Sequence, residues 1–218
     1  MRIISTIIFI LVIHTCAVSY SQEAHETETK MTKEVKELID LGEDAILKLA
    51  LKSVGENVSI TNFTTSRITT NGKEVYVTFS NQYKYLPVNS IFYFDVGVNL
   101  TLQTTYKSAI ANPIGYSDGK NIPFFHQTET IKKHIDFVKE AISTHKNVDF
   151  ETFEEEMTIR ENEDYYAIEL VSASQESSYK IKKSTGEIHD EQHAHLEPAP
   201  IEIDDSQFFE VVDFSEMK

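Results

Sequence analysis

Apolar residues follow two different spacings along the chain, and the two spacings alternate. Between residues 32 and 54 apolar side chains recur every three or four positions, which predicts an amphipathic helix. They are Val35, Leu38, Ile39, Ala45, Ile46, Leu49 and Ala50. Thr32 can cap the start of this helix, Gly42 can bend or divide it, and Gly55 ends it. Because one helix face is apolar, we expect it to lie against a sheet.

A spacing of two residues takes over from Val58 and predicts strands. A short strand is expected at 58–63, and Ile68–Phe79 alternates through Val75 and Val77. Inside this second stretch stands Asn71-Gly72, a strong signal for a hairpin with a type I′ turn, because both residues tolerate positive φ.

The following stretch reads as a connector, two strands and a long loop. Asn81–Pro87 is expected to connect, because proline breaks a strand ladder. Ile91–Val98 is apolar on both faces and should be a central strand or lie at a lobe interface. Leu100–Tyr106 predicts a further strand. Ser108–Pro123 carries two prolines and two glycines and is interpreted as a linker, with a binding loop as the alternative.

The helix-and-hairpin pattern is written twice. Residues 44–79 match residues 135–170, with Ile68, Val77 and their neighbours recurring 91 positions later at Ile159 and Ile168. If the copies are equivalent, Leu47 and Val138 should both be buried, and so should Val77 and Ile168.

The second half repeats the order of elements and ends in an acidic tail. Thr128–Ser143 predicts a helix, the second hairpin turns at Glu161–Asp164, and Ser178–Lys183 is a further strand. Beyond Glu187 the chain becomes acidic, yet Phe208–Phe214 keeps apolar residues at alternate positions, so the tail can dock as an edge strand.

The predicted fold is α+β, with two lobes that each pack a helix on an antiparallel sheet. The expected divisions are a signal peptide at 1–21, a first lobe at 30–107, a linker at 108–127, a second lobe at 128–190 and a partly docked acidic tail at 191–218.

The first 21 residues have the layout of a secretory signal peptide. Arg2 precedes the apolar run Ile3–Val12, and small residues stand before Gln22. Cleavage near Ser21 would remove the only cysteine, Cys16, and with it any disulfide. The mature protein is therefore expected to be soluble and secreted or periplasmic, with no membrane insertion once the signal is removed.

The formal charge of −15 narrows the class of partner. Such a charge repels phosphate backbones and anionic lipid surfaces, so neither nucleic acid nor membrane is expected as a partner. A protein or peptide partner is expected, and a basic one would be attracted.

Two strands near the end of the second lobe carry a resemblance to a known family. Tyr165–Leu170 followed by Tyr179–Ile188, with Thr185-Gly186-Glu187 closing the second strand, resembles the end of a PepSY domain. The aspartate usual before Thr-Gly is missing, and Ser184 stands there. The resemblance implies a non-catalytic exported module used for inhibition or interaction. Two such units in tandem also resemble the cystatin-like architecture, although the Gln-x-Val-x-Gly loop that blocks papain-type proteases is absent.

One run of the sequence is dense in metal ligands. His189, His193 and His195, with Asp190 or Glu191 beside them, could hold zinc, copper or nickel. The alternative is a solvated polar turn, since short histidine-rich tracts are a compositional signal only. Extracellular metal binding through this tract is therefore one alternative function.

Three Asn-x-Ser/Thr sequons occur, at Asn57, Asn62 and Asn99. They are expected to carry glycans if the chain passes through a eukaryotic secretory pathway.

Catalysis is not expected. The sequence has no glycine-rich phosphate loop, no Gly-x-Ser-x-Gly elbow and no Cys/His pair, and no cofactor is predicted. Asp95, on an otherwise apolar strand, is the one candidate for a buried acid; an enzyme would require it to share a pocket with a His or Tyr. The leading hypothesis is a non-catalytic binding or inhibitory module, and a small cone-shaped α+β enzyme is the other alternative.

Overall fold

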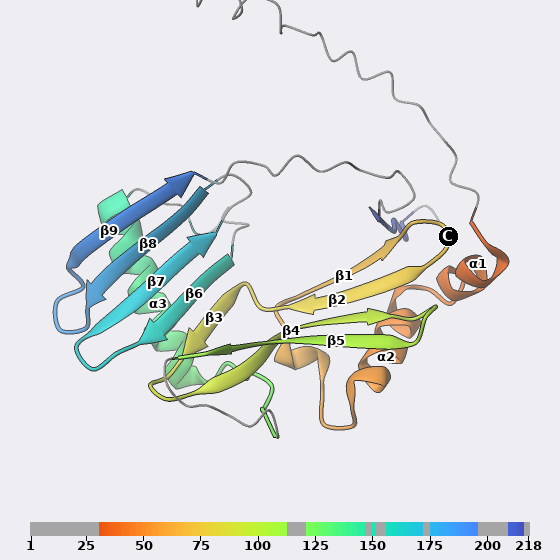
Figure 1. The fold of residues 1–218 in the computed structure, drawn as a ribbon, viewed down its shortest axis with the longest axis horizontal. Helices are drawn as coiled ribbons and strands as arrows, with labels where there is room; N and C mark the ends of the chain where they lie inside the picture. The colour runs from red at the N-terminus through yellow and green to blue at the C-terminus, as the bar shows by residue number, and fades with distance from the viewer. Residues whose placement is uncertain are drawn as a thin grey trace, which may run out of the picture.

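The protein is an α+β fold with two sheets, each covered by helix on one face (Figure 1). The structure is a computed structural model that describes residues 31–112, 121–146, 150, 156–171, 175–195 and 209–215. Within these ranges the chain forms two five-stranded sheets, here called sheet A and sheet B. In Figure 1, sheet A lies beside α1 and α2, and sheet B lies beside α3.

The first helical segment is divided by glycine, as its sequence predicts. Helix α1 spans Lys33–Ile39 and α2 spans Glu43–Val54. Thr32 caps α1 by accepting a hydrogen bond from the Val35 N–H at 3.3 Å. Gly42, with φ of 84°, stands between the two helices in a conformation that other residues rarely adopt.

Sheet A has the order β10-β1-β2-β4-β5. Its strands, antiparallel throughout, are β1 (Thr65–Thr70), β2 (Val75–Ser80), β4 (Ile91–Asn99), β5 (Thr104–Ala111) and β10 (Glu210–Val211). The core between this sheet and the two helices includes Val35, Ile39, Ile46, Ala50, Ile68, Val77, Phe79, Val96 and Val98. Glu210 and Val211 of the acidic tail therefore form an edge strand, within the stretch Phe208–Phe214 whose alternating apolar residues predict docking.

Sheet B has the order β3-β6-β7-β8-β9. Its strands are β3 (Tyr83–Leu86), β6 (Glu156–Glu161), β7 (Tyr165–Val171), β8 (Gln175–Lys182) and β9 (Ile188–His195). Helix α3, Glu129–Lys146, buries Ile135, Val138, Ala141 and Ile142 in the core of this sheet. Four of the strands form an antiparallel meander, whereas β3 pairs with β6 in parallel.

Strands β3 and β4 join the two sheets, because the stretch 83–99 supplies a strand to each sheet and side chains to both cores. Strand β3 follows β2 in the sequence but belongs to sheet B. Along β4, Phe94 packs into the core of sheet B, while Val96 and Val98 pack into the core of sheet A. Ile91–Val98 is expected from its sequence to be a central strand or to lie at a lobe interface. Strand β4 is paired on both sides, with β2 and β5, and contributes side chains to both cores.

Several predicted boundaries are wrong. Residues 58–63 do not form a strand. They contain a 3-10 helix, Ile60–Asn62, which Ser59 caps at its start. Asn81–Pro87 is not a mere connector, since it contains β3. The strand predicted at 100–106 begins instead at Thr104, after a turn in which Gln103 has φ of 55°.

The expected linker at 108–127 is partly structured. Strand β5 continues to Ala111, beyond the expected end of the first lobe at residue 107. Phe124 pairs with Tyr93 in an isolated bridge, and Phe125, 1% exposed, lies in the core of sheet B. Residues 113–120, the middle of this stretch, lie outside the described residues.

The hairpin at Asn71-Gly72 forms, but with another turn. Thr70 pairs with Val75, so four residues make the loop. Gly72 has φ of 79°, whereas Asn71 is not among the residues with positive φ, which excludes a type I′ turn. The Asn71 side chain instead accepts hydrogen bonds from the N–H groups of Lys73 and Glu74, at 3.0 and 2.9 Å. A side chain that caps the backbone in this way is an Asx turn.

The two predicted copies have hairpins of the same register. Ile68 pairs with Val77 in one, and Ile159 pairs with Ile168 in the other. Val77 and Ile168 are both buried, at 0% and 1% exposure. The helices differ, because Val138 is fully buried whereas Leu47 is only half-buried and Ile46 takes the inward position.

No helix among the described residues is long and apolar enough to cross a membrane.

Candidate functional site

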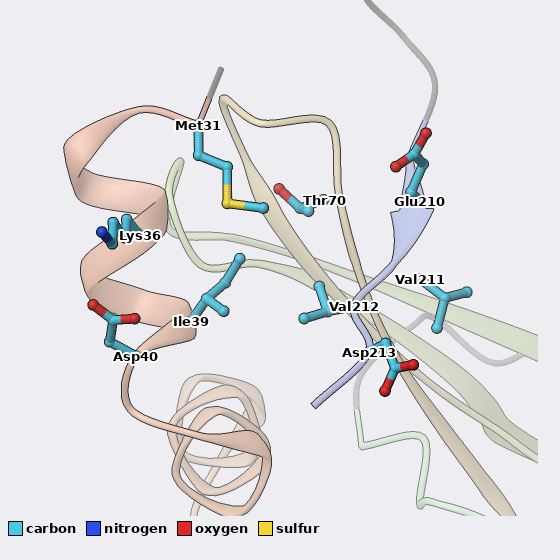
Figure 2. A pocket seen from close by; sticks show the side chains of 9 residues that line it. All are labelled: Met31, Lys36, Ile39, Asp40, Thr70, Glu210, Val211, Val212 and Asp213. Carbon is cyan, nitrogen blue, oxygen red and sulfur yellow. The ribbon is translucent and has the colours of Figure 1, made fainter. Parts of the chain in front are cut away.

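A hollow lies where α1, the end of β1 and the C-terminal segment meet (Figure 2). Its volume is about 440 Å³, within the range of roughly 300–1,000 Å³ usual for ligand sites. It is lined by Met31, Lys36, Ile39, Asp40, Thr70, Glu210, Val211, Val212 and Asp213. In Figure 2, Met31 and Ile39 face Thr70 and Val212 across the hollow.

Local hydrogen bonds fix the walls of this hollow. The Thr32 N–H donates to the Gly72 carbonyl at 2.8 Å, which ties the start of α1 to the β1–β2 turn. The Val212 N–H donates to the Ile68 carbonyl at 3.0 Å, which holds the C-terminal segment against β1. Asp213 accepts from the Ser215 backbone N–H at 2.8 Å, and its hydrogen bonds with Ser215 lower the pKa of the carboxyl group.

The lining combines an apolar floor with acidic groups. Met31, Ile39, Val211 and Val212 supply the apolar surface. The lining contains three carboxylate side chains, Asp40, Glu210 and Asp213, and one cationic side chain, Lys36. The hollow is therefore suited to an apolar group that carries or adjoins positive charge.

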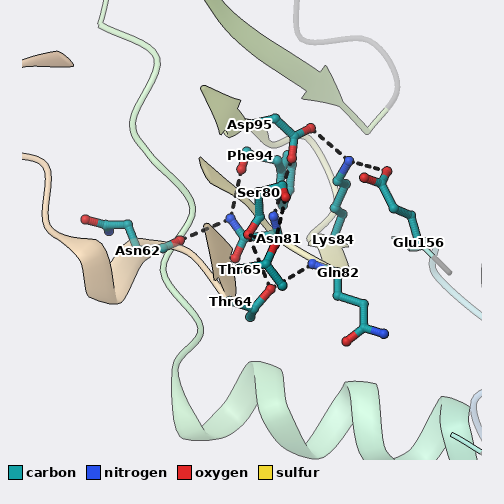
Figure 3. A network of polar contacts seen from close by, with 10 residues as sticks. All are labelled: Asn62, Thr64, Thr65, Ser80, Asn81, Gln82, Lys84, Phe94, Asp95 and Glu156. Carbon is teal, nitrogen blue, oxygen red and sulfur yellow. Dashed lines mark hydrogen bonds and ion pairs between the residues drawn. The ribbon is translucent and has the colours of Figure 1, made fainter. Parts of the chain in front are cut away.

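A second cluster joins the two sheets through a buried lysine (Figure 3). Lys84 Nζ donates to Asp95 Oδ2 at 2.8 Å and to Glu156 Oε2 at 2.6 Å. Burial would lower the pKa of Lys84, but the hydrogen bonds and charges of the two acids outweigh burial and raise it. Because Asp95 lies on β4 and Glu156 on β6, this cluster is a bridge between sheets A and B.

Asp95, the candidate for a buried acid, pairs with a lysine. Its side chain is 26% exposed, and its partners are Lys84 and the Asn81 N–H rather than a His or Tyr. Burial raises its pKa, and Lys84 opposes that shift. Asp95 lines neither the hollow beside α1 nor a second hollow at the start of α2.

A third cluster lies between β3, α3 and the β6–β7 hairpin. The Tyr85 hydroxyl donates to Glu161 at 2.8 Å, and Lys183 donates to the other oxygen of that carboxylate at 2.7 Å. The His134 ring stacks on Tyr85 and its Nδ1 lies 2.6 Å from the Tyr166 hydroxyl. Burial raises the pKa of Tyr85 and of Tyr166, so both hydroxyls stay protonated at neutral pH. The polar groups of this cluster therefore hydrogen-bond to one another beside the core of sheet B.

The histidine tract lies in strand β9 rather than in a turn. The His189 ring contacts the Tyr165 ring, and the His193 ring contacts the Tyr179 ring. His195 ends β9, and its side chain lies outside the described part of the structure. In the described ranges, no group of three or more His, Cys, Asp or Glu side chains is placed to hold a metal ion.

His193 takes part in a chain of polar contacts that resembles a relay. Its Nδ1 lies 2.9 Å from Ser177 Oγ, and its Nε2 contacts Glu191, which also pairs with Lys146. A nucleophilic serine needs donors placed for an oxyanion. Ser177 is 7% exposed and sits between β7 and β9, paired with Leu170 and His193, so its backbone belongs to the sheet ladder. The contact between Ser177 and His193 is therefore interpreted as a side-chain pair between neighbouring strands β8 and β9.

The three sequons have different surroundings. Asn57 is exposed after α2, with no side-chain hydrogen bond to the described residues. Asn62 donates to the Phe125 carbonyl at 3.3 Å and accepts from the Ser59 N–H at 2.9 Å. Asn99 is 5% exposed, donates to Glu74 and accepts from the Leu102 N–H. A glycan fits the folded chain at Asn57 and would disrupt it at Asn99.

Comparison of the chain with protein-family models, curated proteins and solved structures found no match.

Sequence reasoning missed the hollow and the polar cluster around Tyr85, and of the Lys84 cluster it singled out Asp95 alone. The hollow draws its walls from residues 31–40, 70 and 210–213, and no local signal reports that these segments meet. The tail's alternating apolar residues were the one available signal, since they predict that this segment docks on an edge.

Proposed function

We propose that the protein is an exported, non-catalytic binding module that takes a segment of a basic protein or peptide at the hollow between α1 and the C-terminal segment. Inhibition of the bound partner belongs to the same proposal. The observation that carries it is the lining of the hollow, in which an apolar floor is combined with three acidic side chains.

The charge of the whole chain supports a basic partner. With a formal charge of −15, the protein attracts cationic ligands over distances of about a Debye length, roughly 8–10 Å at physiological salt. At the hollow, Asp40 stands on α1 and Glu210 on the C-terminal segment, so both walls contribute negative charge that favours a cationic ligand. An apolar side chain next to that cation would reach the floor at Ile39 and Val212.

The proposed binding can be tested with defined peptides. Fluorescein-labelled ten-residue peptides that alternate Leu with Lys are titrated into the mature protein, and fluorescence anisotropy is recorded at low and high salt. Matched peptides with Glu in place of Lys are the ligand control. We expect saturable binding of the Lys peptide that weakens with salt, and no binding of the Glu peptide. Equal binding of both peptides, or of neither, contradicts the proposal.

A matched pair of variants separates the hollow from net charge. Asp40→Asn with Glu210→Gln removes two carboxylates of the hollow. Glu163→Gln with Glu176→Gln removes two exposed carboxylates of sheet B, so the change in net charge is the same. We expect the first variant to bind at least about ten-fold more weakly, about 1.4 kcal/mol, and the second to bind nearly as the wild type does. An equal loss in both would show that the site is not the hollow.

We also propose that sheets A and B derive from two copies of one helix-and-hairpin unit, related to the tandem architecture that the sequence resembles. The identical register of the β1–β2 and β6–β7 hairpins supports this duplication. The aligned Ala50 and Ala141 are both buried, whereas Ile46 rather than Leu47 is fully buried in the first copy, so the two helices share part of their inward face. An experimental structure whose hairpins superpose while their helices cover opposite sheet faces would reject it.

A further inference from the structure

The C-terminal segment, residues 209–215, contacts β1, Tyr76 of β2 and the core between sheet A and its helices. Val211 and Glu210 pair with Thr69 and Thr70 of β1. The Phe209 ring lies 6.1 Å from the Tyr76 ring, measured between centroids. Val212 and Phe214 pack against the core of sheet A. The edge of β1 therefore recognises this segment by backbone pairing and by two apolar insertions.

The chain reaches this segment from the other sheet. Strand β9, the outermost strand of sheet B, ends at His195, and residues 196–208 separate it from Phe209. At 3.3–3.6 Å per residue, thirteen residues span up to about 45 Å. A connection of that length lets residues 209–215 lie far from the end of β9, on the β1 edge of the same chain or of a neighbouring copy. The β1 edge, Tyr76 and the core beneath them are the same in every copy, so these contacts would be the same in either case.

We propose that the edge of β1 also accepts residues 209–215 of a second copy, so that two chains exchange their C-terminal segments. Such an exchange is reciprocal and closes as a two-fold dimer. In that dimer Glu210, Val211, Val212 and Asp213 of each hollow come from the partner copy. The inference does not depend on what the hollow binds.

A disulfide trap at the β1–β10 pair distinguishes exchange from docking within one chain. Because the Val212 N–H donates to the Ile68 carbonyl, the next pair, Thr69 and Val211, is a non-hydrogen-bonded pair. Cα atoms of such pairs lie about 4.5 Å apart, within disulfide range. Thr69→Cys and Val211→Cys are made in separate, differently tagged mature chains that lack Cys16. The two are mixed and brought to equilibrium in a glutathione redox buffer, in which only preorganised disulfides persist.

The mixture should give a covalent heterodimer that increases with protein concentration. For a short tether the effective concentration is in the millimolar range, so we expect the heterodimer to be abundant near about 1 mM and scarce near about 1 μM. The control mixture pairs Thr69→Cys with Lys33→Cys, whose native side chain is 90% exposed. We expect at least about ten-fold less heterodimer in the control.

A third sample checks the geometry of the pair. The double variant Thr69→Cys/Val211→Cys in one chain should close an internal disulfide near about 1 μM. If the double variant closes but the mixture gives heterodimer only at the control level, exchange does not occur and the proposal is overturned. If the double variant does not close, the segment does not pair with β1 as described, and the proposal is overturned as well.

Discussion

At the scale of single residues, Lys84 shows how one side chain can hold two sheets together. It is 4% exposed and its ammonium group is shared by acids from both sheets. A buried lysine without partners would lose its charge, whereas here the paired acids keep it ionised. The cost of removing it is therefore mainly the cost of leaving two carboxylates facing each other.

Lys84→Met tests that role. The loss of the cation leaves Asp95 and Glu156 unpaired. We expect a loss of about 2–3 kcal/mol in the free energy of unfolding, less than for a fully buried pair because Glu156 is 52% exposed. Urea denaturation at pH 7 measures it. Lys84→Met with Asp95→Asn should recover part of the loss, and failure to recover any would show that packing of the lysine stem dominates.

Glu161 should make the free energy of unfolding fall as the pH becomes acidic. Burial would raise its pKa, but hydrogen bonds from Lys183 and Tyr85 outweigh burial and lower it below 4.5. A carboxylate with a lowered pKa contributes stability that is present above its unfolded value and is lost as pH falls through its folded value. The gap in stability between wild type and Glu161→Gln should therefore shrink as pH falls from about 5 to about 3.

Urea midpoints at pH 7, 5, 4 and 3 provide the measurement for Glu161. Glu163→Gln, an exposed change in the same turn, reports what the loss of one surface carboxylate does. A gap for Glu161→Gln that stays constant with pH would contradict the assignment.

At the scale of elements, local sequence signals predicted the helix ends and the hairpins, but not the strand that pairs with a distant part of the chain. Thr32, Gly42 and Gly55 marked the helices correctly because caps and breaks act within a few residues. The hairpins were found for the same reason. Strand β3 was missed because its partner, β6, lies in the other half of the chain. The clusters around Lys84 and Tyr85 depend on that pairing, so they could not be predicted either.

The β1–β2 turn gives a prediction at this scale. Asn71→Ala removes the oxygen that accepts from the N–H groups of Lys73 and Glu74. We expect a loss of about 1 kcal/mol, seen as a fall of roughly 2–4 °C in Tm. Lys73→Ala, an exposed change in the same loop, should leave Tm nearly unchanged. Equal Tm values for the two variants would mean that the Asn71 side chain does not support the turn.

At the scale of the whole molecule, the shared strands predict that the two sheets unfold together. β4 contributes side chains to both cores, and β3 crosses from one half into the other sheet. Neither sheet can open without exposing apolar residues of the other. The whole protein should therefore behave as one cooperative unit.

Matched core truncations at the repeated positions test this cooperativity. Ile168→Ala in sheet B should cost about 2–5 kcal/mol, and Val77→Ala in sheet A somewhat less, since valine is smaller. Hydrogen exchange of the slowest amides in both sheets should accelerate in either variant. Acceleration confined to the sheet that carries the change would show that the sheets unfold separately.

The placement of β3 also sets when the chain can fold. The Lys84–Glu156 and Tyr85–Glu161 contacts join residues separated by 72 and 76 positions. Contacts this distant in sequence slow folding, because a long loop must close before they form. A nascent chain that has emerged only as far as α3 exposes Tyr85 and Leu86, which in the finished protein are buried. Any fragment that ends before β6 would therefore present an unpaired apolar strand to its neighbours and would be prone to aggregate.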